Sequence, residues 1–205
     1  MGSRALFAVE DGQTCGYYWL QWGSPGYQVP NLATFIRYCR TRGIPPTVEV
    51  FEHFARIYTD GQLPTEAVPA GWWAEDVTDA ENRYRLVIGT GRPVRLLAET
   101  RRYPALGPRR WQQVHQTCGD AQLYLAAARE RDQMAVEIRR MAARDPDLVG
   151  TRWMPVPGLQ PVLAEAARFR RWAAAAQDTA EDAADPGTAG QTRACRASRP
   201  ATTRP

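Results

Sequence analysis

The chain has 205 residues, of which 26 are basic, 22 are acidic and 44% are hydrophobic. This length and apolar content suit one domain with a helical extension and exclude wholesale disorder. No run of about 18 apolar residues is present, so we expect no membrane-spanning helix. The N-terminal segment reaches an acid at Glu10 without a long apolar core, so it is a poor signal peptide.

Every basic residue is arginine, and the chain contains no lysine. We interpret this bias as GC-rich coding, and the alternative is an arginine-specific binding face, because guanidinium groups fork onto phosphate and stack on bases. Residues 185–205 carry four arginines against one acid, so the basic excess is concentrated in this tail. The remainder of the chain is close to neutral.

Cysteine and histidine are too sparse and too widely spaced to predict a metal site. A structural zinc site needs paired ligands a few residues apart, and His115 with Cys118 is the only such pair. We therefore predict no metal, no cofactor and unpaired thiols in a reducing, intracellular compartment, the cytoplasm or nucleus. The residues concerned are Cys15, Cys39, Cys118, Cys195, His53 and His115.

Residues 1–30 are expected to be irregular or to form short strands, with their five clustered aromatic residues packed as a wedge on the helices that follow. A platform for bases or sugars is the alternative. Two helices should come next. Asn31 is a suitable cap for the first, which ends near Gly43, and Thr47 is a suitable cap for the second, which ends near Gly61.

This helix pair could be compared with a DNA-reading helix-turn-helix. The second helix, however, carries Glu49, Glu52 and Asp60 against the single base Arg56, and would meet phosphate with a net negative charge. We therefore predict a packing role for the pair and no base readout.

Residues 61–111 are expected to be rich in loops, with Trp72 and Trp73 buried against the helix pair and one strand at 84–88. Gly89-Thr90-Gly91 lacks the third glycine of a dinucleotide-binding fingerprint and is interpreted as a turn. An enzyme would need a perturbed acid or base in a pocket, for which His53 and His115 are the natural candidates. We predict no catalytic residue, with His53 structural and His115 exposed.

Two long helices are predicted at 119–144 and 161–184, joined by a stiff loop that Trp153 and Met154 should anchor. Such helices suggest an antiparallel hairpin. One alternative is that its alanine-rich seam mediates self-association, and the other is that the hairpin packs on the N-terminal unit. The seam residues are Tyr124, Ala128, Ala135, Ile138 and Ala142.

Together these elements predict a mainly α fold, with an N-terminal helix-turn-helix unit containing irregular or short β segments and a long C-terminal α-hairpin. The expected divisions are a small helical domain at 1–118, the hairpin at 119–184 and a disordered arginine-bearing tail at 185–205.

One stretch of the N-terminal half has a recognisable pattern. It begins with Gln28-Val29-Pro30-Asn31, continues through the helix ending near Cys39, and includes the Gly43-Ile44-Pro45-Pro46-Thr47 turn before Phe51 and Phe54. This pattern resembles the N-terminal, gag-like domain of plant gypsy-type transposon proteins over about 30 to 45 residues. Trp72 and Trp73 match the aromatic pair that often follows in that family.

The resemblance implies a non-enzymatic interaction or assembly protein that associates with itself and escorts nucleic acid. The chain departs from the family in having no zinc knuckle and no strongly basic folded face. The alternative function is a nucleic-acid-binding protein that contacts phosphate, RNA or DNA, through arginines of the tail and loops. The candidate contacts are Arg101, Arg102, Arg109, Arg110, Arg193, Arg196, Arg199 and Arg204.

Overall fold

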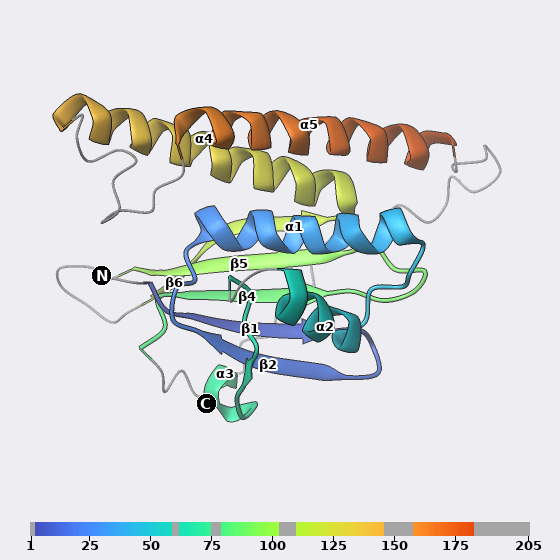
Figure 1. Ribbon diagram of the computed structural model, residues 1–205. Coiled ribbons are helices and arrows are strands. Elements are labelled where there is room, and N and C mark those ends of the chain that lie inside the picture. Colours follow the sequence, from blue (N-terminus) through green and yellow to red (C-terminus); the bar gives the residue numbers. More distant parts are fainter. Residues whose placement is uncertain (1–2, 59–61, 75–78, 103–109, 146–157, 183–205) are drawn as a thin grey trace.

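A six-stranded mixed sheet forms the centre of the protein, with the long helices on one of its faces (Figure 1). The computed structural model describes residues 3–58, 62–74, 79–102, 110–145 and 158–182. The fold is therefore α/β, and the prediction of a mainly α fold is wrong. The strand order is β3-β2-β1-β4-β5-β6, in which β1 pairs parallel with β4 and all other neighbours are antiparallel.

The bounds of the elements show where the sequence-based expectations fail. The strands are β1 (Ala5–Glu10), β2 (Cys15–Leu20), β3 (Glu66–Ala67), β4 (Asn82–Val87), β5 (Arg95–Arg102) and β6 (Arg110–Cys118). The helices are α1 (Pro25–Arg42), α2 (Val48–Tyr58), α3 (Gly71–Ala74), α4 (Asp120–Arg144) and α5 (Leu159–Asp182). The two C-terminal helices confirm the prediction closely, whereas β5 and β6 were not predicted.

The main core lies between the sheet and the layer of α1, α2, α4 and α5. Strand β1 is buried along its whole apolar run; Phe7 stacks on Tyr84 of β4, with 4.8 Å between the ring centroids. Phe169 of α5 belongs to the same buried cluster as the strand residues, so the segments predicted as separate units at 1–118 and 119–184 share one core. No helix in the described part of the chain is long and apolar enough to cross a membrane.

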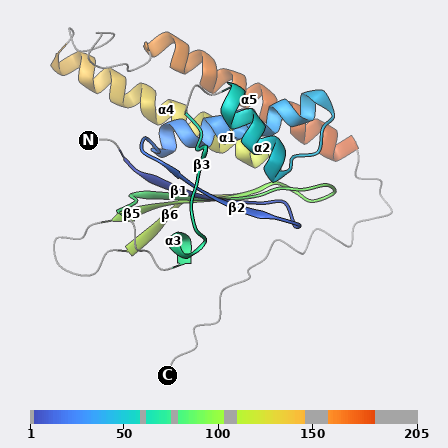
Figure 2. The same cartoon turned by 60° about the horizontal axis from the view of Figure 1, so that its bottom comes forward.

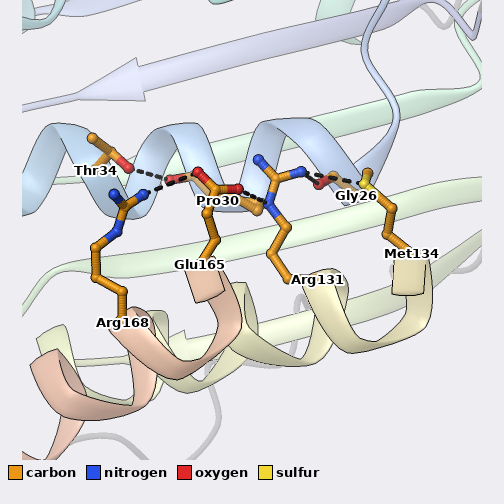
Figure 3. Close-up of polar contacts among 7 residues, drawn as sticks. All are labelled: Gly26, Pro30, Thr34, Arg131, Met134, Glu165 and Arg168. Carbon is orange, nitrogen blue, oxygen red and sulfur yellow. Dashed lines mark hydrogen bonds and ion pairs between the residues drawn. The ribbon is translucent and has the colours of Figure 1, made fainter. Parts of the chain in front are cut away.

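Helix α1 is capped at Ser24, seven residues before the expected cap Asn31, and contains Pro30 inside it. A proline has no N–H, so the carbonyl oxygen four residues earlier, on Gly26, loses its helical hydrogen-bond donor. The guanidinium of Arg131 on α4 supplies the missing donor, with Nη1 3.1 Å from the Gly26 oxygen (Figure 3). A contact from another helix thus satisfies the Gly26 carbonyl oxygen, at the point where Pro30 would otherwise destabilise α1.

Arg131 is also paired across the helix layer. Its Nε lies 2.8 Å from Oε2 of Glu165 on α5, and Glu165 accepts a second contact, at 3.0 Å, from Arg168 (Figure 3). The side chain of Arg131 is only 9% exposed, and this burial lowers its pKa. Arg131 therefore joins α1, α4 and α5 at one buried point.

The N-terminus of α2 is fixed by two side-chain acceptors. Thr47 Oγ1 accepts the N–H of Val50, which confirms Thr47 as the cap, and Asp11 Oδ2 accepts the N–H of Val48. Asp11 lies in the turn between β1 and β2 and also accepts the N–H groups of Gln13 and Thr14. These backbone hydrogen bonds, led by that of Val48, lower the pKa of Asp11 to about 2.

We expect Asp11→Ala to reduce the free energy of unfolding by about 1 kcal/mol at neutral pH, a typical value for a helix-capping side chain. Because folding lowers the pKa of Asp11, its contribution is present above pH 4 and is lost as the pH falls towards 2. Urea unfolding of both proteins across this range measures the difference. A difference that stays constant down to pH 2 would show that the charge of Asp11 is irrelevant.

Candidate nucleic-acid interface

The sheet face opposite the long helices bears a set of stacked tryptophan and arginine side chains. We call this set the Arg–Trp face and define it as Trp73, Arg83, Arg101 and Trp111. Only the short helix α3 lies on this side among the labelled elements (Figure 2). The strand residues pointing to this side alternate with the core residues, as the period of a β-strand requires.

Adjacent strands bring the members of the Arg–Trp face together. Arg101 of β5 is directly opposite Trp111 of β6 in the sheet register, and its guanidinium carbon lies 4.7 Å from the ring centroid. The guanidinium of Arg83 lies 4.5 Å from the same ring and 5.5 Å from that of Trp73. Guanidinium planes and indole rings thus follow one another across three strands and α3, an arrangement that cation–π attraction stabilises.

Carboxylates neutralise part of this surface. Glu99 Oε2 lies 2.5 Å from Arg83 Nε, and Glu10 makes two contacts with Arg85, at 2.7 and 3.1 Å. Arg101 is 5% exposed, whereas Arg95 and Arg110 are exposed. The indole N–H of Trp111 is buried and has no hydrogen-bond partner among the described residues. The face therefore combines stacking groups with the exposed cation Arg95, which lies opposite Val87 of β4 and Cys118 of β6 in the sheet register.

The structure brings some of the predicted contact residues together. Arg102 pairs with Arg110 in the register of β5 and β6, directly beside the pair of Arg101 and Trp111. Arg109 and the four tail arginines, Arg193, Arg196, Arg199 and Arg204, lie outside the described residues, as do Trp153 and Met154. Arg102 and Arg110 are thus neighbours in the sheet, and the alternation along β6 directs Arg110 to the face opposite that of Trp111.

The residues considered for self-association lie inside the protein's own helix layer. Tyr124, Ala128, Ala135 and Ile138 are at most 2% exposed, and Ala142 is half-buried. Tyr124 meets Trp172 of α5 edge to face, with ring centroids 5.7 Å apart. Their side chains therefore pack against α1 and α5. This agrees with the alternative in which the hairpin packs on the N-terminal unit.

The two histidines are placed the other way round from the expectation. His53 is exposed on α2, whereas the side chain of His115 on β6 is only 10% exposed and its Nε2 contacts Oε1 of Glu130 on α4. Glu130 is also close enough to raise the pKa of Tyr84, although burial is the main cause. The contact between His115 and Glu130 forms because the register of β6 places His115 on the face towards α4. No sequence motif predicted it.

The tryptophan pair also lies elsewhere than predicted. Trp72 of α3 meets Trp19 of β2 edge to face at 6.0 Å, and Trp73 lies near Arg83 of β4. Both tryptophans therefore belong to the second face of the sheet and not to the helix pair. That face could not be predicted from the sequence, because β5 and β6 were not predicted as strands.

The described residues include no group of three or more histidine, cysteine, aspartate or glutamate side chains that could hold a metal ion. The indole and guanidinium groups of the Arg–Trp face can stack on planar groups and contact anions. Comparison of the chain with protein-family models, curated proteins and solved structures finds no match.

Proposed function

We propose that this is a non-enzymatic protein that binds single-stranded nucleic acid through the Arg–Trp face. The observation that supports this most is the position of Trp111, with the guanidinium groups of Arg83 and Arg101 over its ring. Sheet surfaces that expose aromatic rings and guanidinium planes bind unpaired bases by stacking, and nearby arginines contact the phosphates. Arg95 is an exposed cation on this face available for such a contact, since it pairs with Val87, which alternates with the core residue Leu86 in β4.

The gag-like resemblance points in the same direction, since it implies a protein that escorts nucleic acid. Assembly with further copies of the chain remains the second part of that prediction. The burial of the hairpin seam favours nucleic-acid binding over assembly through those helices, because the seam residues are already in contact with the chain's own helices.

Binding to a fluorescently labelled single-stranded oligonucleotide should weaken as salt is added. We expect Arg95→Gln to reduce the slope of log affinity against log salt by about 0.7, the value for one phosphate contact on a single strand. We expect Trp111→Leu to weaken binding about fivefold or more with little change in slope, because a lost stacking contact carries no charge. Fluorescence anisotropy over a salt series measures both effects.

Two matched variants serve as controls. Arg139→Gln removes an exposed arginine of α4, and Trp22→Leu removes a tryptophan that is 65% exposed in the turn between β2 and α1. Neither should change affinity or slope. No binding by the wild-type protein at low salt, or equal losses in the control variants, would refute the Arg–Trp face as the interface.

A further inference from the structure

A second surface with ligand-binding character lies between α1 and α2, within the helix layer. It is a shallow groove with a volume of about 330 Å³, at the lower end of the range for small-molecule sites. We call it the α1–α2 groove, and its lining residues are Thr34, Arg37, Tyr38, Thr41, Arg42, Phe54 and Tyr58. The five residues of α1 follow helical spacing and so share one face of that helix.

The floor of the groove is aromatic. Tyr38, Phe54 and Tyr58 are mutually in contact, with ring centroids 5.0 to 5.2 Å apart, and the rings of Phe54 and Tyr58 are stacked at an interplanar angle of 16°. Phe54 is 3% exposed, whereas Tyr58 is 50% exposed. The innermost ring is thus buried in the core, and the outermost offers its surface to a planar ligand.

The rim of the groove is cationic. The guanidinium of Arg42 lies 4.3 Å from the ring centroid of Tyr38, and its Nη1 is 3.2 Å from the hydroxyl of Tyr58. Arg37, one turn earlier on α1, lies beside Trp172 of α5 at 5.5 Å. The side of the groove towards α5 therefore carries a second guanidinium group.

These two arginines differ in their ion pairing from three neighbouring arginines of the helix layer. Arg40 is held by Asp120 at 2.7 Å, and Arg131 and Arg168 are both paired with Glu165. Among the described residues, Arg37 and Arg42 form no ion pair, and no carboxylate lines the groove. Within the described part of the chain, two positive charges therefore lack a carboxylate partner beside an aromatic floor and two threonine hydroxyl groups.

We propose that the α1–α2 groove binds a small planar aromatic anion, a carboxylate or a phosphate monoester, whose ring stacks on Tyr58 and whose anionic group is held by Arg42 and Arg37. A guanidinium group binds either anion with paired, charge-assisted hydrogen bonds. The exposed ring of Tyr58 supplies the apolar contact that orients the ligand. This site is separate from the Arg–Trp face and does not depend on the protein binding nucleic acid.

The proposal can be tested with four probes of related shape. 1-Naphthoate and 1-naphthyl phosphate carry both the ring and the charge, 1-naphthalenemethanol lacks the charge, and cyclohexanecarboxylate lacks the planar ring. We expect saturable binding of at least one aromatic anion by isothermal titration calorimetry and clearly weaker binding of the other two classes. The stronger of the two aromatic anions identifies the preferred anionic group.

Variants then locate the binding site. Arg42→Gln should weaken the preferred probe roughly tenfold, since it removes a charge-assisted contact. Tyr58→Leu should weaken it as well, and unchanged circular dichroism would show that the fold is retained. Arg139→Gln on α4 and Trp111→Leu on β6 should leave the affinity unchanged, which separates this groove from the proposed nucleic-acid site.

Three outcomes would overturn the proposal. The first is the absence of saturable binding of both aromatic anions at millimolar concentrations. The second is equal binding of the uncharged alcohol, which would make the groove a nonspecific apolar patch. The third is binding that survives Arg42→Gln unchanged, which would place the anion elsewhere.

Discussion

Replacing Arg131 by methionine is expected to lower the free energy of unfolding by about 2 kcal/mol, since the Gly26 carbonyl loses a charge-assisted hydrogen bond and Glu165 keeps only Arg168. The substitution leaves the carbonyl oxygen of Gly26 without its donor and removes one of the two arginines that contact Glu165. Methionine fills a similar volume, so the loss should reflect polar contacts more than packing. Urea unfolding followed by circular dichroism measures it.

A double-mutant cycle with Pro30 separates the role of Arg131 in α1 from its role in the ion pair. Pro30→Ala supplies a backbone N–H that can donate to the Gly26 oxygen, which is the group that Arg131 otherwise serves. We expect the double variant to be at least about 1 kcal/mol more stable than the sum of the single effects predicts, because a buried carbonyl regains a partner.

Glu165→Gln is the matched variant for the other half of the contact. It keeps the shape of the side chain and removes the charge that pairs with Arg131 and Arg168. Its effect should be independent of Pro30→Ala, since neither Gly26 nor Pro30 contacts that carboxylate. Strict additivity between Pro30→Ala and Arg131→Met would show that Arg131 does not compensate for the proline.

Phe51→Ala should be the most damaging single truncation in α2, with an expected loss of about 4 kcal/mol for removal of a fully buried phenylalanine side chain. Phe51 is 0% exposed and its ring meets those of Phe35 on α1 and Tyr18 on β2, at 5.4 and 5.7 Å between centroids. It therefore joins α2 to both the helix layer and the sheet.

Phe51→Ala should destabilise α2 locally, in addition to lowering the global free energy of unfolding. An isolated helix of 11 residues is marginal in water, so α2 depends on this packing to remain helical. Hydrogen exchange should accelerate in α2 before it does in β1 or β4. Probe binding in the α1–α2 groove should also be lost, because Phe54 and Tyr58 belong to α2.

Phe51→Leu provides the comparison for that variant. It keeps an apolar side chain at the site and should cost much less than truncation to alanine. Two results would contradict this role of the Phe51 ring in packing α2. One is an equal loss of unfolding free energy in the alanine and leucine variants, and the other is a uniform rise of hydrogen exchange across the protein.

The missing strands show why the fold class could not be predicted from the sequence. Strand β5 has the sequence RLLAETRR and β6 has RWQQVHQTC, in which the alternation of apolar and polar residues is weak. Strand β6 is at the edge of the sheet. On one face of β5, Arg101 stacks against Trp111 of β6. Polar residues are stable in these strands because of the side chains packed beside them in the folded sheet, which the residue pattern of each strand does not contain.

Local signals did determine several features of this protein. Helical periodicity located α4 and α5, Thr47 marked the start of α2, and Gly43 lies in the left-handed conformation after α1, at φ 64°. These features depend on residues within one or two turns of the chain, which a single sequence contains in full.

Only the tertiary structure decided where the polar side chains would act. Pro30 could remain inside α1 because Arg131, a hundred residues later, supplies the hydrogen bond that the proline removes. His115 meets Glu130, and Trp111 meets Arg83 and Arg101, because the register of β6 assigns each side chain to one face of the sheet. A one-residue change of register would exchange those faces, and the register is fixed by the pairing of β6 with β5 in the folded sheet, which the weak residue alternation of β6 does not specify.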